Sequence, residues 1–136
     1  MNTLAWLILV GGILHFGILI ASAAVPQVLD WRQSLGKLDQ LSRQLIWVHG
    51  AFIVLVIIGF GLLSLICAAD LASGTTLARA VCSFIAVFWT CRLAVQFFVF
   101  DAGPFLKNWL LKIGYHGLTA VFLYQAVVFG YAAVWP

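Results

Sequence analysis

Four ionisable side chains stand out within the long apolar runs of the sequence: His15, His49, Arg92 and His116. An ionisable group inside a lipid bilayer costs free energy unless it faces protein or water, so each position prompts a functional hypothesis. A neutral imidazole can ligate haem iron, and a guanidinium can pair with a carboxylate or a phosphate. These residue types therefore predict either a cofactor site or polar contacts between helices.

His49 and His116 are predicted to lie at similar depths, which makes them the candidate ligands of a haem iron. At about 1.5 Å of rise per helical residue, His49 lies about 9 Å beyond Arg43 and His116 about 6 Å beyond Lys112. Helical bundles build cofactor sites from side chains on facing helices, and two such histidines can hold a b-type haem. Arg43, Lys112 and the hydroxyl of Tyr115 would then pair with the haem propionates. A protein of this kind would carry electrons to or from a quinone.

Arg92 and Gln96 extend this predicted cofactor-binding set on a third helix. Arg92 lies about 13 Å before Asp101 along a helix, and Gln96 is one turn nearer to that end on the same face. A guanidinium at that depth cannot lose its proton. The possible interaction partners of Arg92 are carbonyl oxygens, aromatic faces such as Trp89, a water-filled cavity, an anionic cofactor or lipid, or a partner subunit. The last three would give Arg92 a function.

Each histidine also has a purely structural explanation. His49 and His116 lie within about two turns of predicted helix ends, where an imidazole can reach headgroups or water. His15 lies nearer the middle of its run. We expect His15 to hydrogen-bond a Ser, a Thr or a backbone carbonyl of a neighbouring helix.

The sequence does not favour catalysis or nucleic-acid binding. It contains no Gly-x-Ser-x-Gly, no Walker loop and no His-Glu-x-x-His, and no Asp or Glu lies deep within an apolar run. The net charge of +3 forms no basic stripe with interleaved aromatic residues. We therefore expect a protein that is not an enzyme and has no nucleic-acid partner.

The composition predicts an integral membrane protein. Apolar residues make up 65% of the chain and charged residues 8%, against about 45–50% and 25% in soluble domains. Four apolar runs, at about 4–28, 45–69, 77–100 and 109–135, exceed the roughly 20 helical residues that cross a bilayer. We expect a single all-α transmembrane domain over 1–136, an up-down-up-down antiparallel bundle of four helices. The first run is expected to be retained, because it is longer than a signal peptide's apolar region.

The first and third loops carry most of the positive charge. Arg79 is the cation of the second loop, whereas the other two loops with their flanks hold Arg32, Lys37, Arg43, Lys107 and Lys112. Positive charge stays on the cytoplasmic side, so we expect both termini outside, in a bacterial inner (plasma) membrane. The segment 29–44 has leucines at steps of three and four residues, which predicts an amphipathic helix at the interface or an extension of the second span.

Small residues and cysteines predict local contacts. Gly11, Gly12, Gly59 and Gly61 mark places where the first two spans are expected to approach closely. Cys67 and Cys82 flank one turn almost symmetrically. We expect them to behave as small apolar side chains, with a disulfide between them as the alternative.

Three functions remain open. The first is an accessory or structural subunit, without catalysis, that packs against a protein partner or a second copy within the bilayer. The alternative is the b-type haem protein with His49 and His116 as ligands. A third is a small enzyme or carrier that acts on a lipid-soluble molecule near Arg92.

Overall fold

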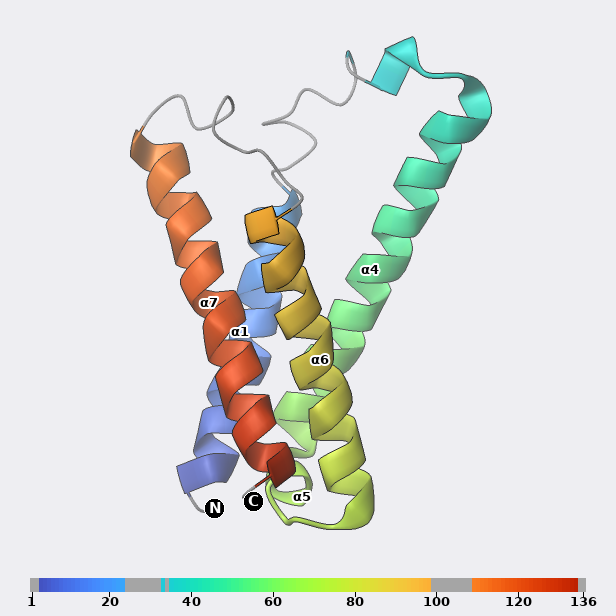
Figure 1. Ribbon diagram of the computed structural model, residues 1–136. Coiled ribbons are helices and arrows are strands. Elements are labelled where there is room, and N and C mark those ends of the chain that lie inside the picture. Colours follow the sequence, from blue (N-terminus) through green and yellow to red (C-terminus); the bar gives the residue numbers. More distant parts are fainter. Residues whose placement is uncertain (1–2, 24–32, 34, 99–108, 135–136) are drawn as a thin grey trace.

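The computed structural model describes residues 3–23, 33, 35–98 and 109–134 of the chain. This part is helical and contains no strand. Its elements are α1 (Thr3–Ala23), a 3-10 turn η1 (Leu35–Lys37), α4 (Gln40–Ile66), α5 (Ala68–Leu71), α6 (Thr76–Phe98) and α7 (Trp109–Val134) (Figure 1). Four of these helices, α1, α4, α6 and α7, are long and apolar enough to cross a membrane.

The observed helices follow the four predicted runs with two differences. α4 begins at Gln40, before the predicted 45, so the leucine-patterned segment extends the second span from that residue on. The rest of 29–44 before η1 lies outside the described residues apart from position 33, and so does the predicted end of the first span at 28. The second span was predicted to run unbroken to 69, but it is interrupted at Cys67.

The connection between α4 and α6 shows how the local sequence ends and starts helices. Cys67 leaves the helical conformation with φ −111° and ψ 27°, and α5 follows as a single short turn. Gly74 has a φ of 79°, a left-handed conformation that favours glycine. The Thr75 hydroxyl then accepts a hydrogen bond of 3.2 Å from the Ala78 N–H, which caps α6. The turn that Cys67 and Cys82 were predicted to flank therefore lies between α5 and α6.

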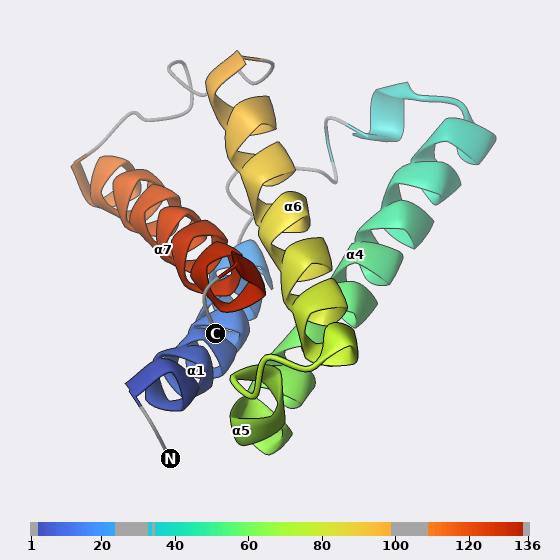
Figure 2. The same cartoon turned by 60° about the horizontal axis from the view of Figure 1, so that its bottom comes forward.

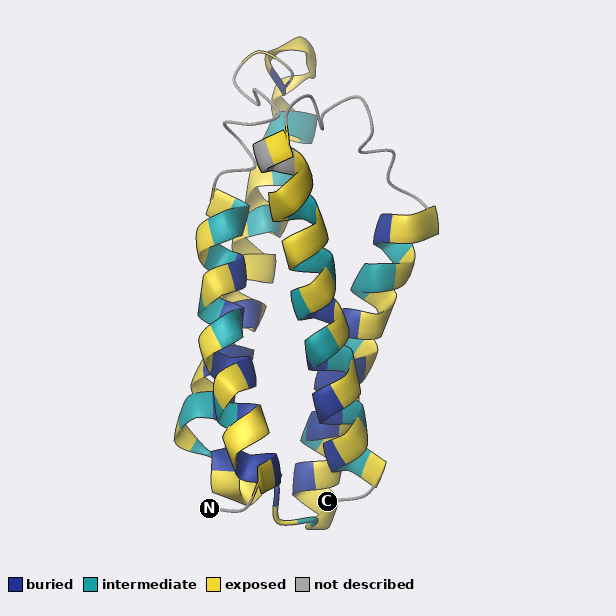
Figure 3. Ribbon diagram, turned by 90° about the vertical axis from the view of Figure 1, so that its left-hand side faces the viewer, coloured by how far each residue is buried: buried dark blue, intermediate teal, exposed yellow. Residues whose placement is uncertain are grey.

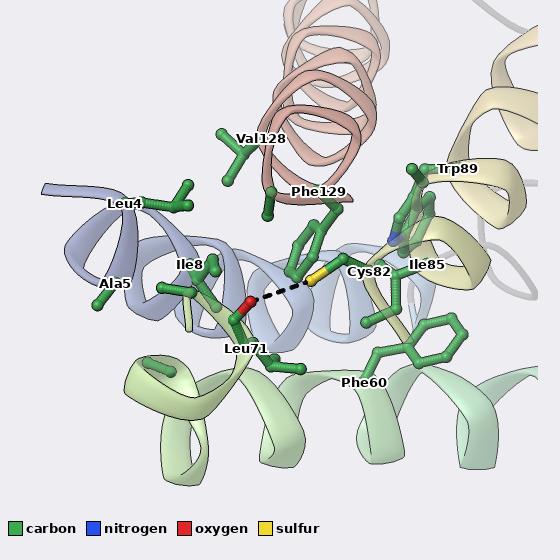
Figure 4. Packing of buried hydrophobic residues seen from close by; sticks show 14 of the residues in the cluster. Leu4, Ala5, Ile8, Phe60, Leu71, Cys82, Ile85, Trp89, Val128 and Phe129 are labelled. Carbon is green, nitrogen blue, oxygen red and sulfur yellow. Dashed lines mark hydrogen bonds between the residues drawn. The ribbon is translucent and has the colours of Figure 1, made fainter. Parts of the chain in front are cut away.

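The core lies in the half of the molecule that contains α5. α6 packs along α7, α1 packs along α4, and α1 also contacts α7 and α5. Buried side chains gather in this half (Figure 3), and Ile8, Ile85, Trp89 and Phe129 are almost completely enclosed (Figure 4). Cys82 is buried among them and its thiol donates to the Leu71 carbonyl at 3.6 Å.

The predicted close approach of the first two spans is confirmed at Gly12 and Gly61. A Cβ on Gly12 would lie 2.9 Å from the Ser64 Cβ, and one on Gly61 would lie 2.7 Å from the Phe16 ring. Gly11 instead faces α7, and a Cβ on Gly59 would meet nothing within 4 Å. The crossing of α1 and α4 therefore depends on two glycines.

The N-terminal half of α4, residues 40–56, does not pack against the other helices as its C-terminal half does. The buried residues of α4 are Ile57, Phe60, Gly61 and Ser64, all in its C-terminal half. Figures 1 and 2 show α4 leaning away from α6 and α7 toward the end opposite α5. No residue of 40–56 is buried by the described part of the chain.

The cysteines that flank the turn are free thiols. Cys67 is half-buried and Cys82 is buried, and neither forms a disulfide. The expectation that they act as small apolar side chains fits the burial of Cys82 in the core.

Candidate functional site

His15 is a fully buried residue of α1 that uses both ring nitrogens. Its Nδ1 lies 2.7 Å from the Gly11 carbonyl oxygen, and the Trp89 Nε1–H donates to its Nε2 at 2.9 Å. A carbonyl can only accept and an indole N–H can only donate, so these partners assign a neutral imidazole with its proton on Nδ1. The hydrogen bond between Trp89 and His15 joins α6 to α1 in the middle of the core.

Aromatic rings enclose the His15 imidazole. The rings of Phe60 and Phe129 meet it edge to face with centroids 6.0 and 5.9 Å away, and Trp89 lies at 5.4 Å. With both nitrogens bonded and the ring enclosed, His15 holds helices together and has no nitrogen left for a ligand. The expected carbonyl partner belongs to α1 itself, and the partner on the neighbouring helix is an indole instead of a hydroxyl or a carbonyl.

Gln125 ties α7 to the same point on α1. Its side chain is fully buried and its Nε2 donates to the Gly11 carbonyl at 2.8 Å. The Tyr124 hydroxyl adds a bond of 2.8 Å to the Leu7 carbonyl. The Gln125 Oε1 has no hydrogen-bond partner among the described residues, and it would lie 2.9 Å from a Cβ on Gly11. Gly11 thus allows the amide to reach the α1 backbone.

Arg92 lies on the contact between α6 and α7. Its Cζ is 5.2 Å from the centroid of the Phe122 ring, and that ring stacks on Trp89 at 5.0 Å with 19° between the planes. An arginine within a bilayer costs about 2.5–3.5 kcal/mol at the centre of a helix, and a cation–π contact offsets part of this. An aromatic face was one of the predicted partners, but the ring is Phe122 and not Trp89.

Gln96 and Thr119 form a second polar pair one turn further along the α6–α7 contact. Gln96 is buried, and its Nε2 donates to the Thr119 Oγ1, which donates to the Tyr115 carbonyl at 3.0 Å. The Tyr115 ring meets that of His116 with the ring centroids 5.6 Å apart. The predicted residues Arg92, Gln96, Tyr115 and His116 are therefore gathered on one pair of helices.

His49 is placed apart from this group. It is exposed on the N-terminal half of α4, and its Nδ1 donates to the Leu45 carbonyl at 2.7 Å. Figures 1 and 2 show α4 and α7 diverging toward their N-terminal ends, and His49 and His116 belong to these parts of the two helices. The structure does not bring the two predicted iron ligands together, and their pairing on one haem stays a prediction.

The hydrogen bond between His15 and Trp89 can be measured with a double-mutant cycle of His15→Leu and Trp89→Phe. We expect a coupling free energy of about 1 kcal/mol, within the range found for hydrogen bonds inside membrane proteins. The measurement is SDS-induced unfolding in mixed micelles. A cycle of His15→Leu with Trp109→Phe, an exposed tryptophan, should give a coupling near zero, and an equal coupling in both cycles would contradict the assignment.

The buried contacts between the helices use only a few kinds of polar group. A neutral imidazole, amides and hydroxyls link α1, α6 and α7, and Arg92 adds a cation. The four long helices contain no Asp or Glu. No family model, no curated protein and no solved structure matches the chain.

Proposed function

We propose that this protein is a membrane subunit, without catalysis of its own, that packs against another polypeptide within a larger assembly. Its four spans would form an up-down-up-down antiparallel bundle in a bacterial inner membrane. The cations Lys37, Arg43 and Lys112 support a cytoplasmic location of the first and third loops, with both termini outside. The buried polar contacts of His15, Gln96 and Gln125 would then give the subunit a fixed shape.

The observation that carries this proposal is the exposure of the N-terminal half of α4. None of residues 40–56 is buried, and the six residues 51–56 are all exposed. Six residues cover more than one turn of helix, so apolar side chains of this stretch are exposed all around the helix. Association of helices in a bilayer is driven by packing, and small residues let backbones approach. Gly50, at which a Cβ would meet nothing within 4 Å, offers such a place.

The proposal predicts that bulk at Gly50 disrupts the assembly without affecting the subunit itself. We expect Gly50→Leu to release the partner, because the added side chain has open space within the chain but blocks an approaching helix. The measurement is the mass of the tagged protein extracted from its native membrane in copolymer discs. Gly59→Leu, an equally open glycine of the same helix, is the control. A particle that holds only one 14.9 kDa chain before any substitution would contradict the proposal.

A b-type haem protein is the second candidate. The observation that favours it is the bond from the His49 Nδ1 to the Leu45 carbonyl, since a metal-ligating histidine commonly donates its other ring N–H to such a group. Ligation by both His49 and His116 requires α4 and α7 to lie closer together than in Figure 1. The test is an absorption spectrum, oxidised and dithionite-reduced, after expression with haem precursor. Bands lost in His49→Ala and His116→Ala would support it, and a colourless protein from haem-replete cells would exclude it.

A further inference from the structure

α4 contacts α6 through the aromatic ring of Phe60. This ring meets those of Phe84 and Phe88 edge to face, with centroids 5.8 and 5.2 Å away. It also meets the His15 imidazole at 6.0 Å, so α1 and α6 hold the same point of α4. Phe60 is buried and belongs to the C-terminal half of α4 (Figure 4). The contact fixes both the height and the face at which α4 meets α6.

The face of α4 that carries Phe60 continues into the N-terminal half of the helix. Val56, Ile53 and His49 precede Phe60 by four, seven and eleven residues, and this spacing places them on one side of a helix. None of the three is buried. A stripe of mostly apolar side chains therefore runs from the packed Phe60 into the part of α4 that diverges from α6.

A face of α6 continues from Phe88 in the same way. Cys91 and Val95 follow Phe88 by three and seven residues, which places them on the side that meets Phe60. Cys91 is exposed and Val95 is half-buried. α4 ends and α6 begins at the end of the molecule that contains α5 (Figure 1), so Ile53 and Val95 both lie toward the opposite end. Each lies seven residues, or about 10 Å, beyond the aromatic contact, so the two faces are in register.

The two faces separate beyond the Phe60 contact, because α4 leans away from α6 there (Figures 1 and 2). Helices associate within a bilayer by packing, and these faces would gain packing against each other. A segment with few buried contacts changes position at a low cost in free energy. The buried residues of α4 begin at Ile57, so the N-terminal half can move while the C-terminal half stays in the core.

We propose that the N-terminal half of α4 docks on α6 in a second, closed conformation, in which Ile53 packs between Cys91 and Val95. The closed contact continues the existing interface at Phe60, with the same faces and the same register. Because Phe60 stays in place in both conformations, closure requires no rearrangement of the core. This inference does not rest on the proposed assembly, since Leu55 and its neighbours on the other side of α4 remain available to a partner.

Disulfide trapping with the native Cys91 tests the closed conformation. Ile53→Cys is oxidised with iodine in the membrane, and the linked peptides of the monomeric fraction are identified by mass spectrometry. We expect a disulfide between position 53 and Cys91, because a disulfide forms only where the two Cα atoms come within about 7 Å. Leu55→Cys is the matched control, since Leu55 is also exposed but lies on the other side of α4. No link from position 53, or an equal link from position 55, would overturn the proposal.

A distance measurement tests the same movement without a new bond. Nitroxide labels replace the exposed Leu45 of α4 and Trp109 of α7, after the native cysteines are changed to alanine, and pulsed electron paramagnetic resonance gives their separation. We expect two maxima in the distance distribution, of which the shorter belongs to the closed conformation. Labels at Phe97 and Trp109 are the control and should give one narrow maximum, because the bond between Gln96 and Thr119 joins α6 to α7 near them. A single maximum for positions 45 and 109, as narrow as that of the control, would overturn the proposal as well.

Discussion

Trp89→Ala is expected to lower the free energy of unfolding in detergent by about 3 kcal/mol, the lower end of the range for such changes in packed cores. The indole is 1% exposed, stacks on Phe122 and donates to His15, so its loss leaves a cavity and an unsatisfied imidazole nitrogen. The lower end applies because lipid and detergent also solvate an apolar side chain in the unfolded state.

The matched control for this change is Trp109→Ala. Trp109 is 73% exposed at the start of α7, so its removal should change stability by no more than about 0.5 kcal/mol. Both variants are compared with the unmodified protein by SDS-induced unfolding, followed by near-ultraviolet circular dichroism. Similar losses at the two tryptophans would show that Trp89 is not the centre of the core.

Gly12→Val is expected to be as damaging, at about 3 kcal/mol, the upper end of the usual penalty for overpacking. Its Cβ would lie 2.9 Å from the Ser64 Cβ, 3.0 Å from the Leu65 Cγ and 3.1 Å from the Gly61 carbonyl oxygen. The carbonyl belongs to a helix backbone and cannot move aside, so α1 and α4 must separate. The same unfolding measurement detects this.

Gly17→Val separates crowding from the general effect of valine in a helix. Gly17 is exposed on the same helix, and a Cβ there would meet nothing within 4 Å. We expect a change of less than about 0.5 kcal/mol at this position. If Gly12→Val were as mild as Gly17→Val, the close approach of α1 to Gly61 would be wrong.

The number and approximate extent of the membrane-spanning helices could be predicted from the sequence, because a run of about 20 apolar residues is a direct physical requirement for crossing a bilayer. The ends of the helices could be predicted less well. The first turn of α4 contains the polar residues Gln40, Arg43 and Gln44, so it lies outside the apolar run from which the span was predicted. A helix can extend beyond the hydrocarbon region, and the apolar run does not mark where it begins. The interruption at Cys67 has no Gly or Pro beside it that would have marked it.

The polar contacts of the core were only partly predictable. Spacing placed Arg92 and Gln96 on one face of a helix, and the structure confirms that both lie on the α6–α7 contact. The bond between His15 and Trp89 depends on how two helices are rotated about their axes, which spacing alone does not fix. Gln125 was missed, although a lone amide in an apolar run is a usable signal for a contact between helices.

Depth alone could not decide whether His49 and His116 face each other. The prediction counted residues from the flanking cations and took the helices to be nearly parallel. Figures 1 and 2 show that α4 tilts away from α7, so two residues at one depth can lie on well-separated helices. Helix tilt is set by packing against neighbours and not by the length of an apolar run.

The proposed role as a membrane subunit is tested most directly by site-specific photo-crosslinking in the native membrane. A benzophenone amino acid replaces Phe52 in the N-terminal half of α4 or, as the matched control, Phe84 of α6, which are 61% and 63% exposed. We expect a discrete crosslink to a polypeptide from position 52 and only lipid adducts from position 84. Lipid adducts alone from both positions would show that lipid covers the N-terminal half of α4, and would contradict the proposal.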